Sequence, residues 1–196
     1  IGSLSVVERR TVMVTLNLIE QLQAPKQKIS IAVAVPKGDR QKVMVDMLTQ
    51  LGVFEIIPLR CRYSVTKFSP NTTEKWLRVA IEACKQSQNP WLPIIASECD
   101  LEQLLDSGEG GSNHSGLNQR NLVVANSDGG SLLSLASRHS DITVIIGPEG
   151  GFSSKEQAFL NNHKQTFPIS LGPRILRADT AVVAALTFWQ NNFGDW

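Results

Sequence analysis

Two glycine-proline turns contain the residues best suited to hold a ligand. The first, GPEGGF at residues 147–152, follows the apolar run ITVII, and the second, GPRIL at residues 172–176, follows TFPISL. Glycine lets the backbone approach a ligand closely and proline makes a turn rigid, so the exposed N–H and C=O groups can bind the edge of a base or a ribose. Either turn alone is also an ordinary strand-to-helix connection. Their occurrence as a pair predicts one shared pocket.

These turns are expected at one edge of a parallel sheet. Between residues 26 and 196, short apolar runs alternate with helical patterns, which predicts an α/β fold with a mostly parallel sheet and helices on both faces. Ligands bind such sheets beyond the carboxyl ends of the strands. The predicted strands are Ile29–Val35, Phe54–Leu59, Leu92–Ala96, Leu122–Ala125, Ile142–Ile146 and Phe167–Leu171.

Capping residues and apolar spacing predict the helices. Ser153 and Glu156 form an S-x-x-E capping box directly after the first turn, and Asp179 begins a last helix that is apolar almost all round. Because a small sheet covers only one face of that helix, a homodimer contact is expected to cover the rest. One further helix is expected to begin at Asp39 and end at Gly52, and another to begin at Thr72 or Thr73 and end near Ser87. Two short helices are expected to begin at Asp100 and at Ser131.

Composition and missing motifs argue against several classes of protein. No apolar run approaches the roughly 18 residues of a membrane span, and Ile1–Arg10 lacks the pattern of a signal peptide. Neither G-x-G-x-x-G nor a P-loop occurs, which disfavours a dinucleotide fold and a P-loop nucleotidase. No metal site is expected, and the thiols are interpreted as reduced cysteines of a cytoplasmic protein, because no ligand spacing links Cys61, Cys84, Cys99, His114, His139 and His163.

Charge is divided unevenly along the chain, although the net charge is only +1. Residues 1–88 hold 13 Lys and Arg against 7 Asp and Glu, whereas residues 89–196 hold 6 against 11. Such an asymmetry can mark a surface that faces nucleic acid, or it can have no functional meaning.

The segments IIGPEGGFSxxE and LGPRILRxxTA, at residues 145–156 and 171–181, resemble the RsmE-like family of RNA methyltransferases. The resemblance covers roughly residues 26–190. It implies a SPOUT-class α/β domain with a deep C-terminal trefoil knot, working in the cytoplasm as a homodimer through the C-terminal helix. The implied activity is methylation of uridine N3 in 16S ribosomal RNA of the small subunit, near the decoding region. Residues 1–25 would then be the remnant of an N-terminal PUA-like β-barrel, and residues 26–196 the methyltransferase domain.

The family resemblance also implies what the turns bind. S-adenosylmethionine would lie among three loops of the knot, with backbone groups around the adenine. The implied cofactor-binding residues are Ala125, Asn126, Ile146, Gly147, Glu149, Gly150, Gly151, Leu171, Gly172, Ile175, Leu176 and Ala181.

Two residues between the second turn and the last helix are the implied catalytic groups. Arg177 would stabilise negative charge that spreads onto the uracil carbonyl oxygens, because its guanidinium is permanently charged and forks toward planar acceptors. The structural alternative is an ion pair with Asp179 or Glu149. Asp179 would orient Arg177 or accept a proton, although an ordinary Asp is a weak base. The implied RNA-binding residues are Lys37, Arg40, Arg60, Arg62, Lys67 and Arg174.

Several positions depart from the family pattern. Met47 and Gln50 stand where the family has Lys and Glu, Asn89 stands where it has Arg, and Ala178 and Asp179 stand where it has Thr and Glu. The cofactor turns are intact, so the departures concern the substrate side. They motivate a second hypothesis, an RNA-binding or ribosome-assembly factor that keeps the fold with weak or no catalysis. A third, a nucleotide-binding oxidoreductase, is disfavoured by the missing fingerprint.

Overall fold

A computed structural model describes residues 2–7, 12–16, 25, 27–106, 121–130, 141–194 and 196. The N-terminal part contains an antiparallel hairpin of β1 (Gly2–Val7) and β2 (Val12–Leu16), which forms a sheet of its own. The β-branched, partly alternating residues 6–22 predict one strand or a hairpin remnant, and the structure has a hairpin at residues 2–16. Its interpretation as a barrel remnant stays a prediction.

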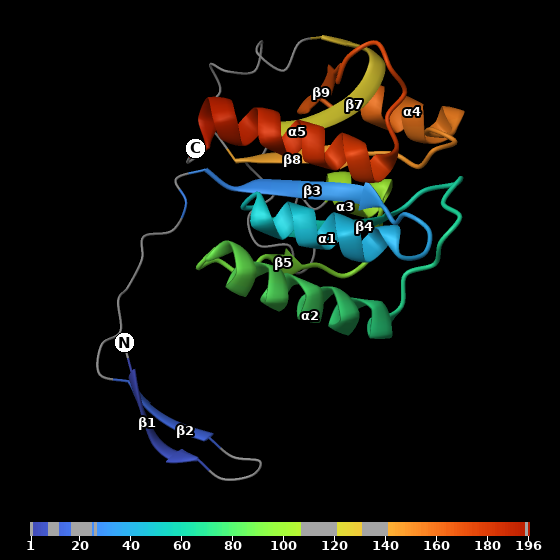
Figure 1. The fold of residues 1–196 in the computed structure, drawn as a ribbon. Coiled ribbons are helices and arrows are strands. Elements are labelled where there is room, and N and C mark those ends of the chain that lie inside the picture. The colour runs from blue at the N-terminus through green and yellow to red at the C-terminus, as the bar shows by residue number, and fades with distance from the viewer. Residues whose placement is uncertain are drawn as a thin grey trace.

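A parallel sheet forms the centre of the main body. Its strands are β3 (Ile29–Ala34), β4 (Glu55–Arg60), β5 (Ile94–Ile95), β6 (Cys99–Asp100), β7 (Asn121–Gly130), β8 (Ile142–Ile146) and β9 (Thr166–Ile169). They lie in the order β5-β4-β3-β8-β7-β9, with β6 beside β4, and all the described pairings are parallel (Figure 1). The predicted mostly parallel α/β fold is confirmed.

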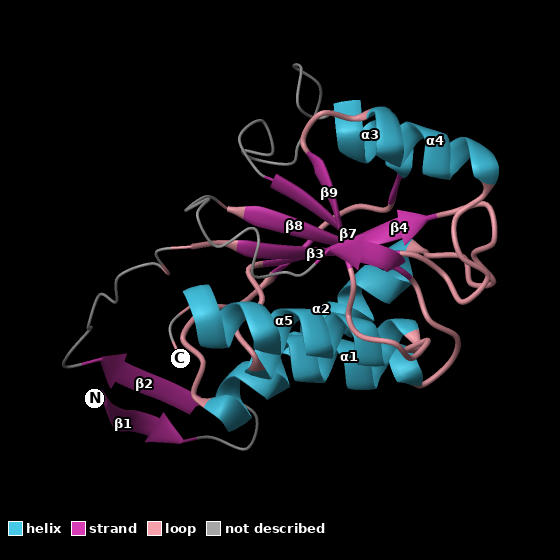
Figure 2. Ribbon diagram, turned by 90° about the horizontal axis from the view of Figure 1, so that it is seen from above, coloured by secondary structure: helices cyan, strands magenta, loops and turns pink. Residues whose placement is uncertain are grey.

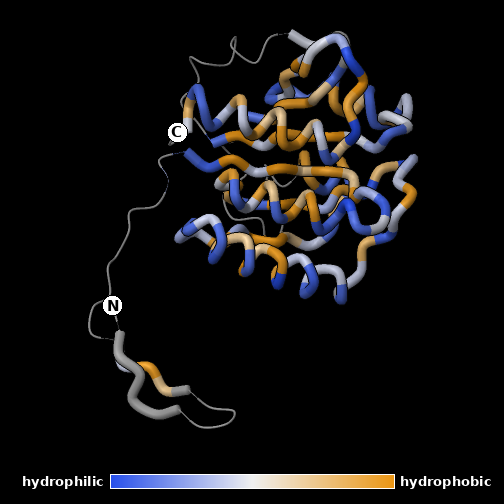
Figure 3. The backbone as a smooth tube through the Cα atoms, in the orientation of Figure 1, coloured by the Kyte–Doolittle hydropathy of each residue, from blue (hydrophilic) through white to orange (hydrophobic). Residues whose placement is uncertain are grey.

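Helices cover both faces of this sheet, and each face has its own apolar core. On one face lie α1 (Arg40–Gln50), α2 (Pro70–Ser87) and α5 (Ala178–Phe193), and on the other lie α3 (Leu101–Asp106) and α4 (Ser154–Asn162) (Figure 2). Alternate residues of β3 serve the two cores: Ile31 and Val33 face one, Ala32 and Ala34 the other. Burial on both sides explains why the strands are continuously apolar in sequence (Figure 3).

Two strands, β5 and β7, differ from the predicted length by more than one residue. β5 is shorter than Leu92–Ala96, because Pro93 has no N–H to donate to the neighbouring strand. β7 is longer than Leu122–Ala125 and curves, so that both Ala125 and Gly130 are register partners of Ile169 in β9. The added length depends on Gly129, where any Cβ would collide with the backbone of Ile169. Periodicity alone could not show this contact.

The helix starts were predicted to within a few residues. Asp39 precedes α1, but its side chain makes no capping hydrogen bond, and α2 begins at Pro70 after Ser69 rather than at Thr72 or Thr73. Proline is favoured at the first helical position, where its missing N–H costs nothing. Asp100 and Gln103 have the spacing of a capping box, and the structure forms it before α3: the Asp100 carboxylate accepts from the N–H of Gln103 at 2.9 Å, while the Asp100 N–H donates to the Gln103 side chain at 3.0 Å. The helix predicted from Ser131 lies outside the described residues.

The last helix, α5, is covered more fully by its own chain than predicted. Val182, Leu186 and Trp189 are buried, and α1 packs beside it as well as the sheet. The Gln190 side chain donates hydrogen bonds to the carbonyl oxygens of Leu51 (2.8 Å) and Gly52 (3.2 Å), which ties the end of α5 to the end of α1. Within the described part of the chain, no helix has the length and apolar character to cross a membrane.

Candidate active site

The two glycine-proline turns meet at one edge of the sheet. β8 and β9 both pair with β7, with Ile145 beside Val124 and Ile169 beside Ala125, so the carboxyl ends of β8 and β9 flank the middle of β7. Ala125 and Asn126 of β7 and the segments that leave β8 and β9 enclose a cavity of about 360 Å³. The sequence-based prediction of one shared pocket is thus matched by the geometry.

Most residues expected to bind a cofactor line this cavity, which we call the turn cavity. From the predicted set it is lined by Ala125, Asn126, Ile146, Gly147, Glu149, Gly151, Leu171, Gly172, Ile175, Leu176 and Ala181. Gly150 alone from that set does not line it. The remaining lining residues, which were not predicted as cofactor-binding, are Pro148, Phe152, Gln157, Pro173 and Arg174.

Glycine is needed in the turn cavity for two different reasons. Gly151 and Gly172 have φ angles of +71° and +106°, which residues with a side chain rarely adopt. Gly147 is needed for space, because a Cβ there would lie 2.9 Å from Cζ of Phe152. The Phe152 ring therefore packs under the first turn and forms part of the cavity wall.

Phe152 and Gln157 line the turn cavity but were missed by the sequence-based prediction of cofactor-binding residues. Phe152 stands inside the first motif and could have been found there by asking what fills the space beside Gly147. Gln157 follows the capping-box residue Glu156, and the first turn of α4 directs its side chain to the cavity. Its amide donates to Asn161 at 3.0 Å. Finding it required knowledge of where α4 lies relative to the turn.

The capping box after the first turn fixes the orientation of α4. The Glu156 carboxylate accepts from the N–H and the hydroxyl of Ser153, both at 2.7 Å, and from the N–H of Arg62 at 2.8 Å. Partial burial acts to raise the pKa of Glu156, but these hydrogen bonds outweigh it and lower the pKa below its ordinary value. One ionised carboxylate thus joins the turn, α4 and the loop after β4.

Comparison with known proteins agrees with this geometry. A family model described as an RNA methyltransferase domain matches residues 23–190. The chain belongs to this family. Ribosomal RNA small subunit methyltransferase E of Rickettsia conorii is 36% identical over 179 residues, which cover 88% of this chain and 68% of that protein. The protein of the same name from Synechocystis is 33% identical over 158 residues, covering 81% of this chain and 51% of the relative. The chain therefore spans about half to two thirds of these relatives' length.

Solved structures share the fold. A Ribosomal RNA small subunit methyltransferase E from Neisseria gonorrhoeae, bound to S-adenosylmethionine, superposes with a TM-score of 0.86 at 22% identity and covers 100% of this chain and 79% of its own. At that identity the likeness concerns the fold. A Legionella pneumophila structure that contains the bound cofactor S-adenosylmethionine has a TM-score of 0.83 and 28% identity, with the same coverage of both chains.

The two candidate catalytic residues of this family member lie beside the turn cavity without lining it. Arg177 is exposed and precedes α5, and Asp179 is half-buried in the first turn of that helix. Their neighbours Leu176 and Ala181 both line the cavity. Within the described residues, Arg177 makes no ion pair, whereas Glu149 lies 3.7 Å from Arg40. The alternative that an ion pair with Asp179 or Glu149 occupies Arg177 therefore receives no support.

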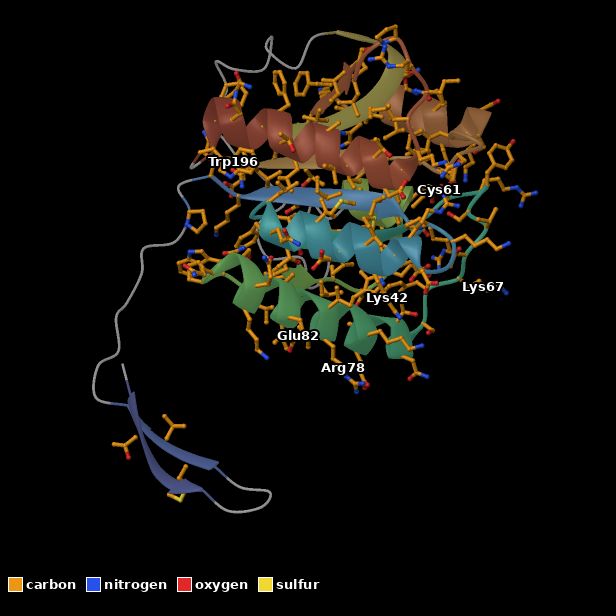
Figure 4. The ribbon with its side chains drawn as sticks, viewed as in Figure 1. Lys42, Cys61, Lys67, Arg78, Glu82 and Trp196 are labelled. Atoms are coloured by element: carbon orange, nitrogen blue, oxygen red, sulfur yellow. The ribbon has the colours of Figure 1, made fainter. Side chains whose placement is uncertain are left out.

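The six candidate RNA-binding residues fall into two groups. Lys37, Arg62 and Lys67 are exposed at the side of the molecule to which the strands point, where Figure 4 labels Lys67. The side chains of the others pair with carboxylates or line the turn cavity. Arg40 pairs with Glu149, Arg174 lines the turn cavity, and Arg60 lies 3.3 Å from both Glu98 and Asp100. Arg60 and Arg62 line a second cavity of about 450 Å³.

None of the five substituted family positions 47, 50, 89, 178 and 179 lines the turn cavity. Gln50 donates to Asp46 at 2.8 Å, and Asn89 donates to the carbonyl oxygen of Thr49 at 2.9 Å while accepting from the N–H of Trp91. Asn89 thus holds the end of α2 against the end of α1. Ala178 is buried at the start of α5.

Proposed function

We propose that this protein transfers the methyl group of S-adenosylmethionine to N3 of a uridine in 16S ribosomal RNA of the small subunit. The observation that carries the proposal is that both family turns enclose one cavity at the carboxyl ends of β8 and β9, beside Ala125 and Asn126 of β7. Such an edge is where parallel sheets bind ligands. A ribosomal RNA substrate and reduced thiols fit a cytoplasmic enzyme.

The residues present fit the cofactor in size and chemistry. The volume of about 360 Å³ falls in the range of small-molecule sites, roughly 300–1,000 Å³. Ile146, Leu171 and Leu176 offer apolar surface to a flat adenine ring, and the glycine turns offer N–H and C=O groups without interfering side chains. Backbone recognition of this kind costs little side-chain entropy on binding.

The bound cofactor supplies a methyl group that is already electrophilic, so the protein has three tasks. It must align uracil N3, help N3 lose its proton, and stabilise the negative charge that then spreads to the flanking carbonyl oxygens. Arg177 is proposed for charge stabilisation, because it stands between two cavity residues and no described carboxylate neutralises it. Asp179 is proposed to orient Arg177 or accept the proton.

The RNA is proposed to contact the positive side chains beside the cavity. Arg174 lines the cavity itself, and Lys37, Arg40, Arg60, Arg62 and Lys67 belong to the positively charged half of the sequence. Phosphate contacts release counterions, so binding through these residues should weaken steeply as salt rises.

Two further parts of the proposal concern assembly. A trefoil knot at the turns and a homodimer through α5 both follow from the family resemblance. In support of the dimer, Val183, Ala184 and Thr187 of α5 remain only half-buried in the single chain. Residues 1–25 are proposed as the end of an N-terminal PUA-like barrel.

The proposal is tested in two steps with the whole chain. Calorimetry measures binding of S-adenosylmethionine, and mass mapping then locates the methyl group in purified small-subunit RNA after incubation with protein and cofactor. We expect binding, and N3-methyluridine in the product. Cofactor binding without transfer under these conditions would favour the RNA-binding factor instead. A folded protein that binds no cofactor would contradict the proposal at its first step.

A further inference from the structure

A half-exposed aromatic ring lies on the outer side of the first turn. Tyr63, the single tyrosine of the chain, is 50% exposed in the loop after β4. Its side chain packs against Gly150: a Cβ on that glycine would lie 3.2 Å from Tyr63 Cβ and 3.7 Å from Cδ2. Gly150 is thus the turn residue that admits Tyr63, which accounts for its absence from the lining of the turn cavity.

The loop that carries Tyr63 is held in place from both sides. The Cys61 N–H donates to the Ser64 hydroxyl at 2.9 Å, and the Ser64 N–H donates to the Cys61 carbonyl oxygen at 3.1 Å. The Arg62 N–H donates to Glu156 at 2.8 Å. A ring on so constrained a backbone loses little conformational entropy when a partner stacks on it.

The Arg62 side chain, next to Tyr63, forms no ion pair with the residues that the structure describes. It lines the second cavity, where the other cations are paired: Arg60 with Glu98 and Asp100, and Lys155 with Glu102 at 2.8 Å. The Arg62 guanidinium, by contrast, has no carboxylate within ion-pair distance among the residues that the structure describes. Its hydrogen bond to Glu156 uses the backbone N–H, and the guanidinium interacts with that carboxylate only through the charge effect that helps lower the Glu156 pKa.

We infer that Tyr63 and Arg62 form a subsite for an unpaired nucleotide adjacent to the methylated uridine. The base would stack on the phenol ring and the phosphate would bind the guanidinium, the combination by which proteins hold single-stranded RNA. The subsite lies one turn away from the cofactor cavity, because residues 147–152 present Gly150 to Tyr63 and their other side to the cavity. This inference rests on the proposed function, and it assigns to Tyr63 the selection of RNA that is single-stranded beside the target uridine.

Fluorescence anisotropy with a uridine-containing single-stranded RNA oligonucleotide tests the subsite in the full chain. Tyr63→Ala should weaken RNA binding by about 5- to 150-fold, since one base stack is worth roughly 1–3 kcal/mol. Tyr63→Phe should bind like the wild type, because the ring and not the hydroxyl provides the surface. Arg62→Gln should weaken binding and reduce the salt slope by about one.

The matched control is Trp91→Ala, which removes another exposed ring, 39% exposed, from the connection between α2 and β5. It should leave RNA affinity unchanged. Calorimetry with S-adenosylmethionine distinguishes a defect in RNA binding from a defect in cofactor binding, because all these variants should bind cofactor like the wild type.

Three results would overturn the subsite. One is wild-type RNA affinity in Tyr63→Ala, and another is a wild-type protein that binds cofactor but no single-stranded RNA. The third is a changed sedimentation coefficient in Tyr63→Ala, which would show that the ring contacts a second copy of the chain. Failure of the proposed function would be seen differently, as absent cofactor binding or absent transfer in the wild type.

Discussion

The segment of residues 147–159 separates two cavities that are built by different means. On one side, the turn cavity is lined largely by the backbone of glycine-proline turns and by apolar side chains. On the other, the second cavity is lined by charged side chains from β4, β6, α3 and α4, most of which pair with one another. A backbone-lined cavity has a fixed shape and few charges, which suits a small cofactor. A cavity lined by paired charges, with one guanidinium that forms no ion pair within the described residues, suits a larger, negatively charged partner.

The difference also separates what each cavity can do chemically. The turn cavity is proposed to hold and orient the cofactor, and the proposed chemistry needs one more group, Arg177, at its border. In the second cavity Asp100 and Glu102 are paired with cations and Glu156 accepts from N–H and O–H groups, so phosphate binding there is proposed to depend on Arg62. Substitutions should therefore separate transfer, cofactor binding and fold stability.

The largest effect is expected from Arg177→Ala. Loss of a group that stabilises transition-state charge typically costs 10²–10³-fold in rate, so methyl transfer should fall by about that factor while cofactor affinity stays near wild type. Single-turnover transfer and calorimetry measure the two quantities. Arg78→Ala is the control, because that side chain lies on the outer surface of α2 (Figure 4) with 79% of it exposed. Wild-type transfer in Arg177→Ala would remove Arg177 from the mechanism.

A smaller effect on cofactor binding is expected from Gly172→Ala, with Gly38→Ala as its match. Both glycines have positive φ, +106° and +67°, and neither would bring a Cβ within 4 Å of other atoms. Each variant should lose about 1–2 kcal/mol of unfolding free energy from backbone strain. Only Gly172 lines the turn cavity, so only its variant should bind cofactor more weakly, by about tenfold. Equal affinity in the two variants would show that the second turn does not contact the cofactor.

Glu156→Gln tests the segment between the two cavities. It should cost about 1 kcal/mol of unfolding free energy at neutral pH, because the hydrogen bonds that the Glu156 carboxylate accepts would lose their charge assistance. The folded pKa of Glu156 is lowered relative to the unfolded value of about 4.3. Its contribution is therefore complete above the unfolded pKa and is lost as pH falls through the folded pKa. Urea unfolding at pH 7 and at acid pH should show the wild-type advantage shrinking below about pH 4. An advantage that is independent of pH would contradict the assignment.

The smallest functional effect is expected from modifying the thiols. Burial raises the pKa of Cys61 and of Cys99 to about 12, with nearby carboxylates adding to the shift. Burial also raises the pKa of Cys84, but this residue is less buried. Iodoacetamide at neutral pH should therefore label Cys84 first and leave cofactor binding unchanged, with Cys61 and Cys99 reacting only after unfolding. Rapid labelling of Cys61 would show that the floor of the second cavity opens in the native protein.

Sequence alone was sufficient for the turn cavity because its determinants are local. Gly147, Pro148, Gly172 and Pro173 specify turns by their own conformational limits, and the alternation of elements places those turns at one edge of the sheet. Phe152 stands inside the first motif and could have been found beside Gly147, whereas Gln157 required the packing of α4, and the curvature of β7 required the contact of Gly129 with Ile169. The second cavity could not be predicted as a unit, since Arg62, Glu102 and Lys155 come from three distant segments whose meeting depends on the folded sheet.

Hydrogen exchange with and without S-adenosylmethionine tests most directly whether both turns contact one cofactor, because it reports on the backbone amides of both turns in one experiment. If the two turns enclose one cofactor, residues 146–151 and 171–176 should become protected together, while the amides of α2 exchange as before. Protection of one turn alone, or of neither under conditions where calorimetry shows the cofactor bound, would contradict the account.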